Sequence, residues 1–331
     1  MTNSPLISIV IPCYNGARFL ASTLDSVLAQ SESDWECVIV DDGSTDSSVD
    51  LAAQYARRDP RFRVLSQANS GPSAARNLGF RDTSLSSSFV TFMDADDIWL
   101  SDALETLRAA LERCPEALGA HGLGEFIDEA GVPLQPGVWA GTGRQRYGYD
   151  GRRLSLLDPS MPTDFSVLIN GNTLFPPGLL LTRRWGYEKA GPWDETFRGP
   201  EDWDMLIRLS RHGYLQFIDR VILYYRMHGS NGGAAAGIAD AAWRVRCKAF
   251  HSPENTPEQQ RIAIGGWRAY QVDMIKERLR SAREELAHGK ILEATNLLAR
   301  VPVHALRYVR GCPVYRREFP PRRGIFPAKK A

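Results

Sequence analysis

The chain has 331 residues, of which 43% are hydrophobic and 24% are charged. This length suits two domains or one large domain, and the composition is that of an ordinary globular protein. The 40 Lys and Arg residues balance the 39 Asp and Glu residues, for a formal net charge of +1. The balance argues against a uniformly basic nucleic-acid-binding protein and against an acidic disordered chain, so we expect no nucleic-acid partner.

Cysteine spacing and the first residues bear on the compartment. Five cysteines lie far apart without a CxxC pair, which argues against a disulfide framework and a cysteine zinc site. The opening MTNSPLISIV has no basic region followed by a long apolar core, so no secretory signal peptide is expected. The longest uncharged stretch, residues 166–182, contains glycines and prolines and does not resemble a membrane span. We therefore expect a cytoplasmic protein.

Apolar patterns in the first hundred residues alternate between two types. Short β-branched or aromatic runs predict four strands, at Leu6–Ile11, Glu36–Val40, Phe62–Leu65 and Phe89–Met93. Helical spacing follows each of them, over Arg18–Ala29, over Ser47–Arg57 with Asp46 as its cap, from Pro72, and from Ser101 or Asp102. Strands and helices that alternate at this spacing predict βαβ units on a parallel sheet.

Polar or acidic residues follow all four predicted strands. The strand ends read PCYN, DDGS, QANSG and DADD in chain order. Open α/β sheets bind ligands beyond the carboxyl ends of their strands, so we expect these four segments to line one cleft.

The sharpest local feature is the pair Asp94 and Asp96. Two carboxylates two residues apart in an extended chain point to the same side, where unpaired like charges are costly. Hard oxygen ligands suit Mg²⁺ or Mn²⁺, which commonly bridge protein carboxylates to substrate phosphates. A solvated turn that caps the next helix is the alternative for an isolated DxD pattern.

Several motifs in order make the chain resemble the family 2 glycosyltransferases of the GT-A fold. The matching segments, spread over residues 6–231, are ISIVIPCYN, DSVLAQ, ECVIVDDGSTD, NSGPSAARNLG, FMDADD, GPWDETFRGPEDWDMLIRL and YYRMHGSN. The resemblance implies an α/β fold with a GT-A, Rossmann-like, doubly wound mixed sheet, followed by a C-terminal helical region.

The resemblance also assigns donor-binding roles. It implies that Pro12 and Tyr14 form the shelf under the nucleotide base and that Asp42 reads the base edge, supported by Asp41. Gly71 then lets the backbone approach the donor. Arg76 resembles an arginine beside the nucleotide, and Ala95 belongs to the same donor-binding set.

Metal and catalytic roles follow from the same resemblance. Asp94 and Asp96 resemble a metal-binding DxD motif, with Asp96 the more direct ligand, and Asp202 resembles the catalytic base. Arg226 and His228 match a late motif that closes over the diphosphate, where His228 is a further candidate ligand. Structural readings remain open for four positions: an acidic helix start at Asp202, a hydrogen-bonded His228, a packing Tyr14 and a solvated Arg76.

The predicted domain organisation has three parts. Residues 1–232 form the glycosyltransferase domain, with a nucleotide-binding half over about 1–124 and an acceptor-side half over about 125–232. Residues 233–303 form a helical region with an apolar stripe that suits packing, a dimer or a membrane surface: Ile264, Trp267, Gln271, Ile275, Leu279, Ala282 and Leu286. Residues 304–331 form a basic, Pro-rich tail that suits an anionic membrane surface or a solvated end.

These expectations combine into one functional hypothesis with two alternatives. The hypothesis is an inverting, Mn²⁺- or Mg²⁺-dependent transfer from a nucleotide sugar, with a UDP-sugar favoured, to a glycan or lipid-linked acceptor in cell-surface polysaccharide synthesis. The enzyme would be cytoplasmic, with peripheral contact at the inner face of the membrane left open. A catalytically silent glycan-binding relative is one alternative, and a sugar nucleotidyltransferase is the other.

Overall fold

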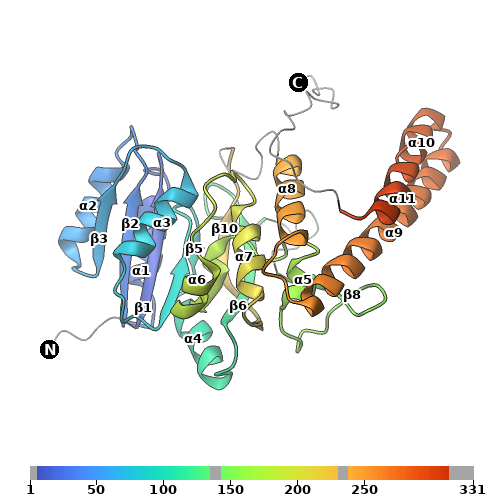
Figure 1. Ribbon diagram of the computed structural model, residues 1–331. Helices are drawn as coiled ribbons and strands as arrows, with labels where there is room; N and C mark the ends of the chain where they lie inside the picture. Colours follow the sequence, from blue (N-terminus) through green and yellow to red (C-terminus); the bar gives the residue numbers. More distant parts are fainter. Residues whose placement is uncertain (1–5, 135–142, 230–237, 313–331) are drawn as a thin grey trace.

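The structure is a computed structural model that describes residues 6–134, 143–229 and 238–312. Its centre is an eight-stranded sheet in the order β3-β2-β1-β4-β9-β6-β10-β5 (Figure 1). The parallel half contains β1 (Ile7–Cys13), β2 (Trp35–Asp41), β3 (Phe62–Ser66) and β4 (Phe89–Phe92). All four were predicted from short apolar runs, and each begins and ends within about two residues of its predicted bounds.

The other half of the sheet mixes strand directions. It contains β5 (Ile98–Trp99), β6 (Gly119–Ile127), β9 (Leu180–Arg183) and β10 (Leu215–Arg226). Strand β9 runs antiparallel to both β4 and β6, and β5 runs antiparallel to β10, whereas β6 and β10 are parallel. The predicted mixed α/β sheet is therefore confirmed.

Helices of the sheet domain occur where the apolar periodicity predicts them in the first half. They are α1 (Leu20–Leu28), α2 (Ser48–Arg58), α3 (Pro72–Asp82) and α4 (Ala103–Arg113). Asp46 lies one residue before the N-cap Ser47, and its carboxylate accepts from the amide of Ser48 at the start of α2 and also from the amide of Ala17. It thereby ties the start of α2 to the loop after β1.

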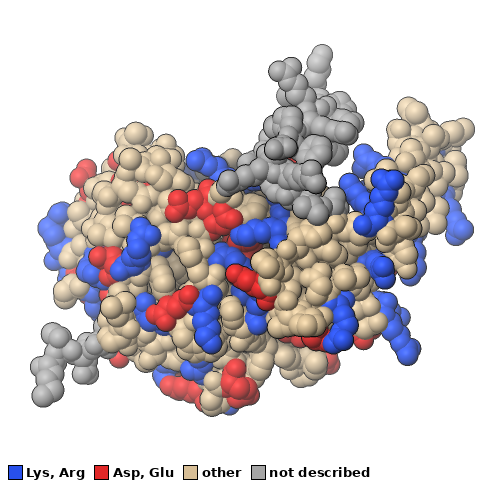
Figure 2. All heavy atoms as spheres, in the orientation of Figure 1, with Lys and Arg blue, Asp and Glu red and all other residues tan. Residues whose placement is uncertain are grey.

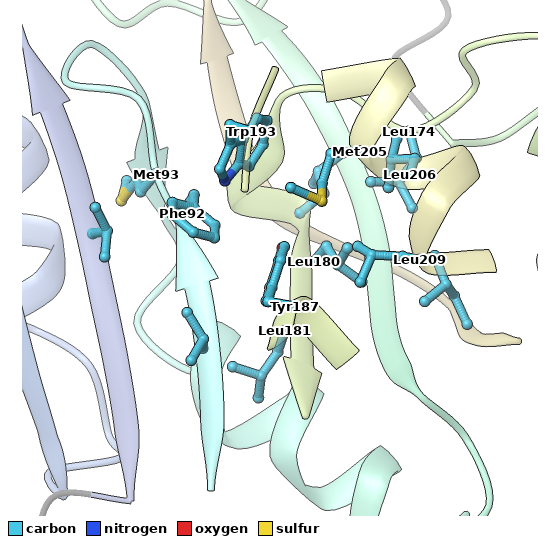
Figure 3. Packing of buried hydrophobic residues seen from close by; sticks show 14 of the residues in the cluster. Phe92, Met93, Leu174, Leu180, Leu181, Tyr187, Trp193, Met205, Leu206 and Leu209 are labelled. Atoms are coloured by element: carbon cyan, nitrogen blue, oxygen red, sulfur yellow. The ribbon is translucent and has the colours of Figure 1, made fainter. Parts of the chain in front are cut away.

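The second half carries shorter elements around the same sheet. They are α5 (Phe165–Leu168), the 3₁₀ helix Pro177–Leu179, α6 (Arg184–Ala190), α7 (Glu201–Ser210) and a small hairpin of β7 (Tyr147–Tyr149) with β8 (Leu154–Leu156). Figure 3 shows how Phe92 of β4, Leu180 and Leu181 of β9, Tyr187 of α6 and Met205 of α7 meet in one buried cluster. This apolar contact fixes the start of α7 against the middle of the sheet.

Four further helices follow the sheet domain. They are α8 (Ile238–Phe250), α9 (Pro257–Ala287), α10 (Ile291–Leu298) and α11 (Val301–Arg310). The predicted apolar stripe on α9 is only partly used for packing, because Trp267, Gln271 and Ala282 are buried while Leu279 and Leu286 are exposed. Helix α11 crosses the predicted boundary at residue 303, and residues 313–331 of the basic tail lie outside the described residues.

A close helix–sheet contact joins α3 to the parallel half of the sheet. Gly79 of α3 faces Val10 of β1 and Val40 of β2, and a Cβ atom at Gly79 would lie 3.0 Å from Val40 Cγ2 and closer still to Val10 Cγ1. Only a residue without a side chain allows α3 to approach the sheet this closely. The contact positions the N-terminus of α3, which begins beside the carboxyl ends of β1 and β2.

Replacing Gly79 with valine is therefore expected to destabilise the protein. Overpacking at a filled contact of this kind costs about 1–3 kcal/mol of unfolding free energy. Chemical denaturation followed by circular dichroism measures the change. Gly171→Val is the matched control, because a Cβ at Gly171 meets nothing within 4 Å. Equal stabilities for the two variants would contradict the close contact.

Candidate functional site

The loops after β1 and β2 form the first wall of the site. The amide of Asp42 donates to the carbonyl of Cys13 at 2.8 Å, which joins the two strand ends. Pro12 is buried in β1, while the side chain of Tyr14 just beyond it is 54% exposed and open to solvent. An exposed aromatic ring at the edge of the sheet is available for stacking, which suits the shelf role predicted from the resemblance.

Asp42 organises the third strand-end loop. Its Oδ1 accepts from Gln67 Nε2 at 2.7 Å and from the amide of Ser70 at 2.8 Å, and its Oδ2 accepts from the amide of Gly71 at 2.8 Å. Gly71 has φ +92°, a left-handed conformation that glycine adopts without steric cost, and it precedes the first turn of α3. Asp41 holds the neighbouring turn by accepting from the amide of Ser44.

Arg76 joins the two halves of the site. It lies in the second turn of α3, is 3% exposed, and donates to Asp94 Oδ1 at 2.7 Å and to Glu201 Oε1 at 3.0 Å. Its guanidinium carbon also lies 4.6 Å from the ring centroid of Trp193. The guanidinium group is therefore not solvated, because it is bound by the carboxylates of Asp94 and Glu201, which lie on opposite sides of the site.

The segment after β4 carries the two carboxylates of the DxD motif, and each of them contacts a different basic side chain. Asp94 bonds Arg76, whereas Asp96 Oδ2 lies 2.7 Å from Nε2 of His228. The side chains of Asp94 and Asp96 remain 29% and 26% exposed. Ala95 between them is partly buried and packs against the hydrophobic core. Both carboxylates therefore keep a solvent-facing side on which a ligand can be bound.

Arg226 fixes the backbone of the same segment. Its Nε donates to the carbonyl of Asp96 at 3.0 Å, and its Nη1 donates to the carbonyl of Glu129 at 3.0 Å. Its own amide donates to Asp97 Oδ1 at 3.1 Å. Burial, followed by the charges of Asp96 and Asp94, raises the pKa of Asp97 well above its ordinary value.

Asp202 lies in the first turn of α7, next to the Glu201 that Arg76 binds. Its Oδ2 accepts from Asn172 Nδ2 at 3.1 Å, and its Oδ1 accepts from the amide of Trp203 at 2.6 Å. Burial, and then the charge of Glu201, raises the pKa of Asp202 to about 7, against the lowering effect of these hydrogen bonds. A carboxylate with a pKa near neutrality is well matched to accept a proton at physiological pH.

Two observations place Asp202 and the DxD carboxylates in one neighbourhood. Arg76 contacts both Asp94 and the neighbour of Asp202. Independently, the pKa of Tyr225 in β10 is raised first by burial and then by the charges of Asp97, Asp94, Asp96 and Asp202. The carboxylates from the end of β4 and from the start of α7 therefore face a common region.

No ready-made metal cage exists in the part of the chain that the structure describes. No group of three or more His, Cys, Asp or Glu side chains there could hold a metal ion by itself. The carboxylates of Asp94 and Asp96, together with His228, are the ligand types present at the site.

Comparisons with known proteins agree with this geometry. The family model described as "Glycosyl transferase family 2" matches residues 8–158. An uncharacterized glycosyltransferase of Nostoc sp., alr2836, is 31% identical over 249 residues, which cover 73% of this chain and 71% of that protein. The chain belongs to glycosyltransferase family 2.

Further relatives of this glycosyltransferase match over shorter stretches. The putative teichuronic acid biosynthesis glycosyltransferase TuaG of Bacillus subtilis is 38% identical over 144 residues, covering 42% of this chain and 55% of TuaG. Among solved structures, Staphylococcus aureus TarS 1–349 in complex with UDP-GlcNAc aligns with a TM-score of 0.57 and 16% identity, over 90% of this chain and 91% of that chain. At this identity the likeness concerns the fold, which is the one expected from the sequence.

Three further residues bind the predicted site residues and were not predicted from the sequence. Glu201 binds Arg76, Asn172 binds Asp202, and Gln67 binds Asp42. Asn172 had a detectable signal, because it is one of only two polar amide side chains in the longest uncharged stretch of the sequence. Glu201 lies inside a quoted family motif and Gln67 inside the strand-end segment QANSG, but nothing local to them reveals a partner far away in the chain.

Removing the buried guanidinium should destabilise the enzyme strongly. Arg76→Met leaves Asp94 and Glu201 without their cation, and breaking a buried ion pair in this way costs about 3–5 kcal/mol. Arg63→Met is the matched control, because Arg63 also bridges two carboxylates, those of Glu36 and Asp82, but is 42% exposed. Exposed pairs contribute about 0–1 kcal/mol, so denaturation midpoints of the two variants should differ clearly. Similar midpoints would contradict a structural role for Arg76.

Proposed function

We propose that this family 2 enzyme is an inverting, metal-dependent glycosyltransferase that transfers a sugar from a UDP-sugar to a hydroxyl of a glycan or lipid-linked acceptor in cell-surface polysaccharide synthesis. The observation that carries the proposal is the Arg76 bridge between Asp94 and Glu201, because it brings the DxD carboxylates and Asp202 to one site. Transfer needs a stabilised leaving diphosphate and a deprotonated acceptor hydroxyl, and the two sides of this bridge supply groups for each.

Asp202 is the proposed general base. Its raised pKa makes its carboxylate a better proton acceptor than an ordinary aspartate, and Asn172 holds Oδ2 while the amide of Trp203 holds Oδ1. A single displacement by the acceptor oxygen inverts the anomeric carbon and requires one base and no enzyme nucleophile. The proton of the acceptor hydroxyl then passes to Asp202, while the bond from the anomeric carbon to the diphosphate breaks.

Asp94 and Asp96 are the proposed ligands of Mn²⁺ or Mg²⁺, with His228 beside them. The residues fit such an ion, because magnesium-type sites often use one or two carboxylates and complete their coordination with water and substrate phosphates. The bound ion would supply charge neutralisation for the leaving diphosphate. His228 Nε2 lies 2.7 Å from Oδ2 of Asp96, so Asp96 could bind the ion through its other oxygen, Oδ1, while the histidine keeps this contact.

Donor recognition is assigned to the loops around Asp42. Each carboxylate oxygen has room for more than one hydrogen bond, and Oδ2 of Asp42 accepts only one from the residues that the structure describes. The remaining capacity suits the N–H edge of uracil, with Tyr14 exposed nearby on the β1 side. The TarS structures contain UDP and UDP-GlcNAc, which supports a uridine donor for this chain as part of the proposal.

The proposed acceptor class rests on the name of one relative, TuaG, and on the basic composition of residues 304–331. TuaG is named for teichuronic acid biosynthesis, which supports a surface polysaccharide as the product class. No helix in the described part of the chain is long and apolar enough to cross a membrane. A lipid-linked acceptor would instead require peripheral contact, for which the basic residues 304–331 were the candidate in the sequence.

Asp202→Asn should reduce turnover strongly without weakening the fold. Losing a general base reduces the rate by about 10²-fold or more. Because the folded-state pKa lies above the unfolded value, ionising Asp202 costs stability as the pH rises through about 7, and the neutral amide removes that cost. The melting temperature at pH 8 should therefore hold or rise.

A pH profile adds a second readout for Asp202. In the unchanged enzyme, kcat/KM should increase with pH around an apparent pKa near 7, since the deprotonated carboxylate is the active form. Asp34→Asn is the control, because Asp34 is exposed just before β2, at the opposite edge of the sheet. Retained turnover in Asp202→Asn would remove this residue from the mechanism.

Nucleotide binding tests the donor and metal assignments together. A thermal-shift panel of UDP, dTDP, GDP and CMP, each with and without Mn²⁺, should show a Mn²⁺-dependent stabilisation with UDP. Asp96→Ala should remove the Mn²⁺ dependence, whereas Asp34→Ala should keep it. If none of the four nucleotides shifts the melting temperature, a silent glycan-binding relative is favoured. If a product assay detects release of pyrophosphate, a nucleotidyltransferase is favoured.

A further inference from the structure

The three C-terminal helices form an arm that projects beyond the sheet domain (Figure 1). Helix α9 contains 31 residues and is therefore about 46 Å long. Helices α10 and α11 pack back along it, with His304 Nδ1 2.8 Å from Gln271 Oε1 and Trp267 Nε1 donating to the carbonyl of Arg307 at 3.1 Å. The start of α10 therefore lies at the tip of the arm, and the end of α11 lies near its base.

Most of the apolar surface of this arm is uncovered. Within α10 only Ala294 is buried, and within α11 only His304. Ile291 and Leu292 at the tip are 69% and 71% exposed, and Val309 is 76% exposed. The arm holds most of the exposed large hydrophobic residues in the described chain: Ile264, Leu279, Leu286, Ile291, Leu292, Leu298, Val303, Leu306, Tyr308 and Val309.

The other exposed large apolar residues of the described chain are fewer and are spread over several elements of the sheet domain. Leu85, for example, is 86% exposed in a loop of the sheet domain and stands alone there. Contiguous apolar patches on soluble proteins mark interaction sites, because leaving them in water has a free-energy cost. Figure 2 shows uncharged atoms over the outer end of the arm, with Lys and Arg side chains along its flanks.

The charge of the arm selects among the partners that an apolar surface could bind. Arg283, Arg300 and Arg310 have no ion-pair partner within the described residues, unlike Lys276, Arg280 and Lys290 of the same arm. From the sequence, the arm, residues 257–310, contains ten Lys and Arg residues against six Asp and Glu residues, for a net charge of +4. Since the whole chain has a net charge of +1, the remaining residues sum to −3.

We propose that this arm docks on the surface of an anionic lipid bilayer, with Ile291 and Leu292 entering the interface and Arg300 and Arg310 contacting lipid headgroups. Exposed apolar residues beside basic ones on helices are the pattern of interfacial membrane binding. Each basic residue near an anionic surface contributes about 1 kcal/mol, and the arm carries a net charge of +4 while the rest of the chain carries −3. The proposal rests on the proposed function, because a lipid-linked acceptor is what membrane docking would bring to the site.

The first turns of α9 pack near the proposed general base, Asp202. Gly265 and Gly266 of α9 press against Tyr149 and Asn170, and positions this crowded admit no side chain. Asn170 begins the short segment that ends at Asn172, whose Nδ2 donates to Asp202. Docking of the arm would therefore present the acceptor side of the enzyme to a substrate held in the same bilayer.

Vesicle co-sedimentation of the full-length protein tests the proposal. The protein should bind phosphatidylcholine vesicles that contain phosphatidylglycerol, bind phosphatidylcholine alone far more weakly, and dissociate as salt is raised. The paired change Ile291→Asp with Leu292→Asp should weaken binding at least about tenfold, because it removes the apolar tip. The paired change Arg300→Glu with Arg310→Glu should weaken binding at least about tenfold through charge.

Matched controls separate the arm from the surface in general. Leu85→Asp replaces an equally exposed apolar residue, and Arg57→Glu with Arg58→Glu reverses two exposed charges on α2; both variants should bind like the unchanged protein. The UDP thermal shift should persist in every variant, so that loss of vesicle binding is distinguished from failure of the proposed activity.

Three results would overturn the proposal. One is absence of binding to anionic vesicles by the unchanged protein while its UDP shift is present. Another is undiminished binding by the tip variant, which would place the contact elsewhere in the chain. The third is a dimer in solution that the tip variant converts to monomer without any vesicle binding, which would assign the apolar surface to a second copy of the chain.

Discussion

The buried ion pairs of Arg76 are the interaction on which the site depends. Arg76 and Glu201 are separated by 125 positions in the sequence, yet their side chains meet beneath Asp94. The next residue of α3, Asn77, strengthens the same junction by accepting from the amide of Trp193 at 2.8 Å and donating to its carbonyl at 3.0 Å. Two adjacent residues of one helix thereby hold the segment that leads into α7.

The junction also accounts for the charge of the site. Asp94, Asp96, Asp97, Glu201 and Asp202 converge there, and like charges this close raise one another's pKa values unless cations intervene. Arg76 and Arg226 supply fixed positive charge, and the charge of Arg226 acts against the rise in the pKa of Asp97, but two guanidinium groups still face five carboxylates. An anionic diphosphate would be repelled from such a surface, which is a physical reason to propose a divalent ion on Asp94 and Asp96.

How much the sequence predicts depends on how local the cause is. The strands β1 to β4 and their helices follow from apolar periodicity, and the strand-end positions of Asp42 and Asp94 follow from the geometry of parallel sheets. The Arg76 bridge was not predictable, because α3 shows an ordinary helical pattern and the partner Glu201 is set by tertiary packing. The apolar stripe of α9 shows a second limit of prediction from sequence. Periodicity identifies the apolar face of a helix, but it does not show whether another element buries that face. Leu279 and Leu286 satisfy the periodicity and are nevertheless exposed.

The same competition between local and tertiary effects decides the chemistry of Asp202. An acidic residue in the first turn of a helix is stabilised as the anion by the helix dipole, by about 0.3–1 kcal/mol, which alone would lower its pKa. A change of one pKa unit corresponds to about 1.4 kcal/mol, so the rise from the model-compound value of 3.8 to about 7 is several times larger than the dipole effect and of opposite sign. Burial of Asp202 and the charge of Glu201 therefore override the local preference. Arg76 holds Glu201 in place but its own charge lowers the pKa of Asp202, so the interaction that assembles the site both positions the carboxylate that raises this pKa and limits the rise.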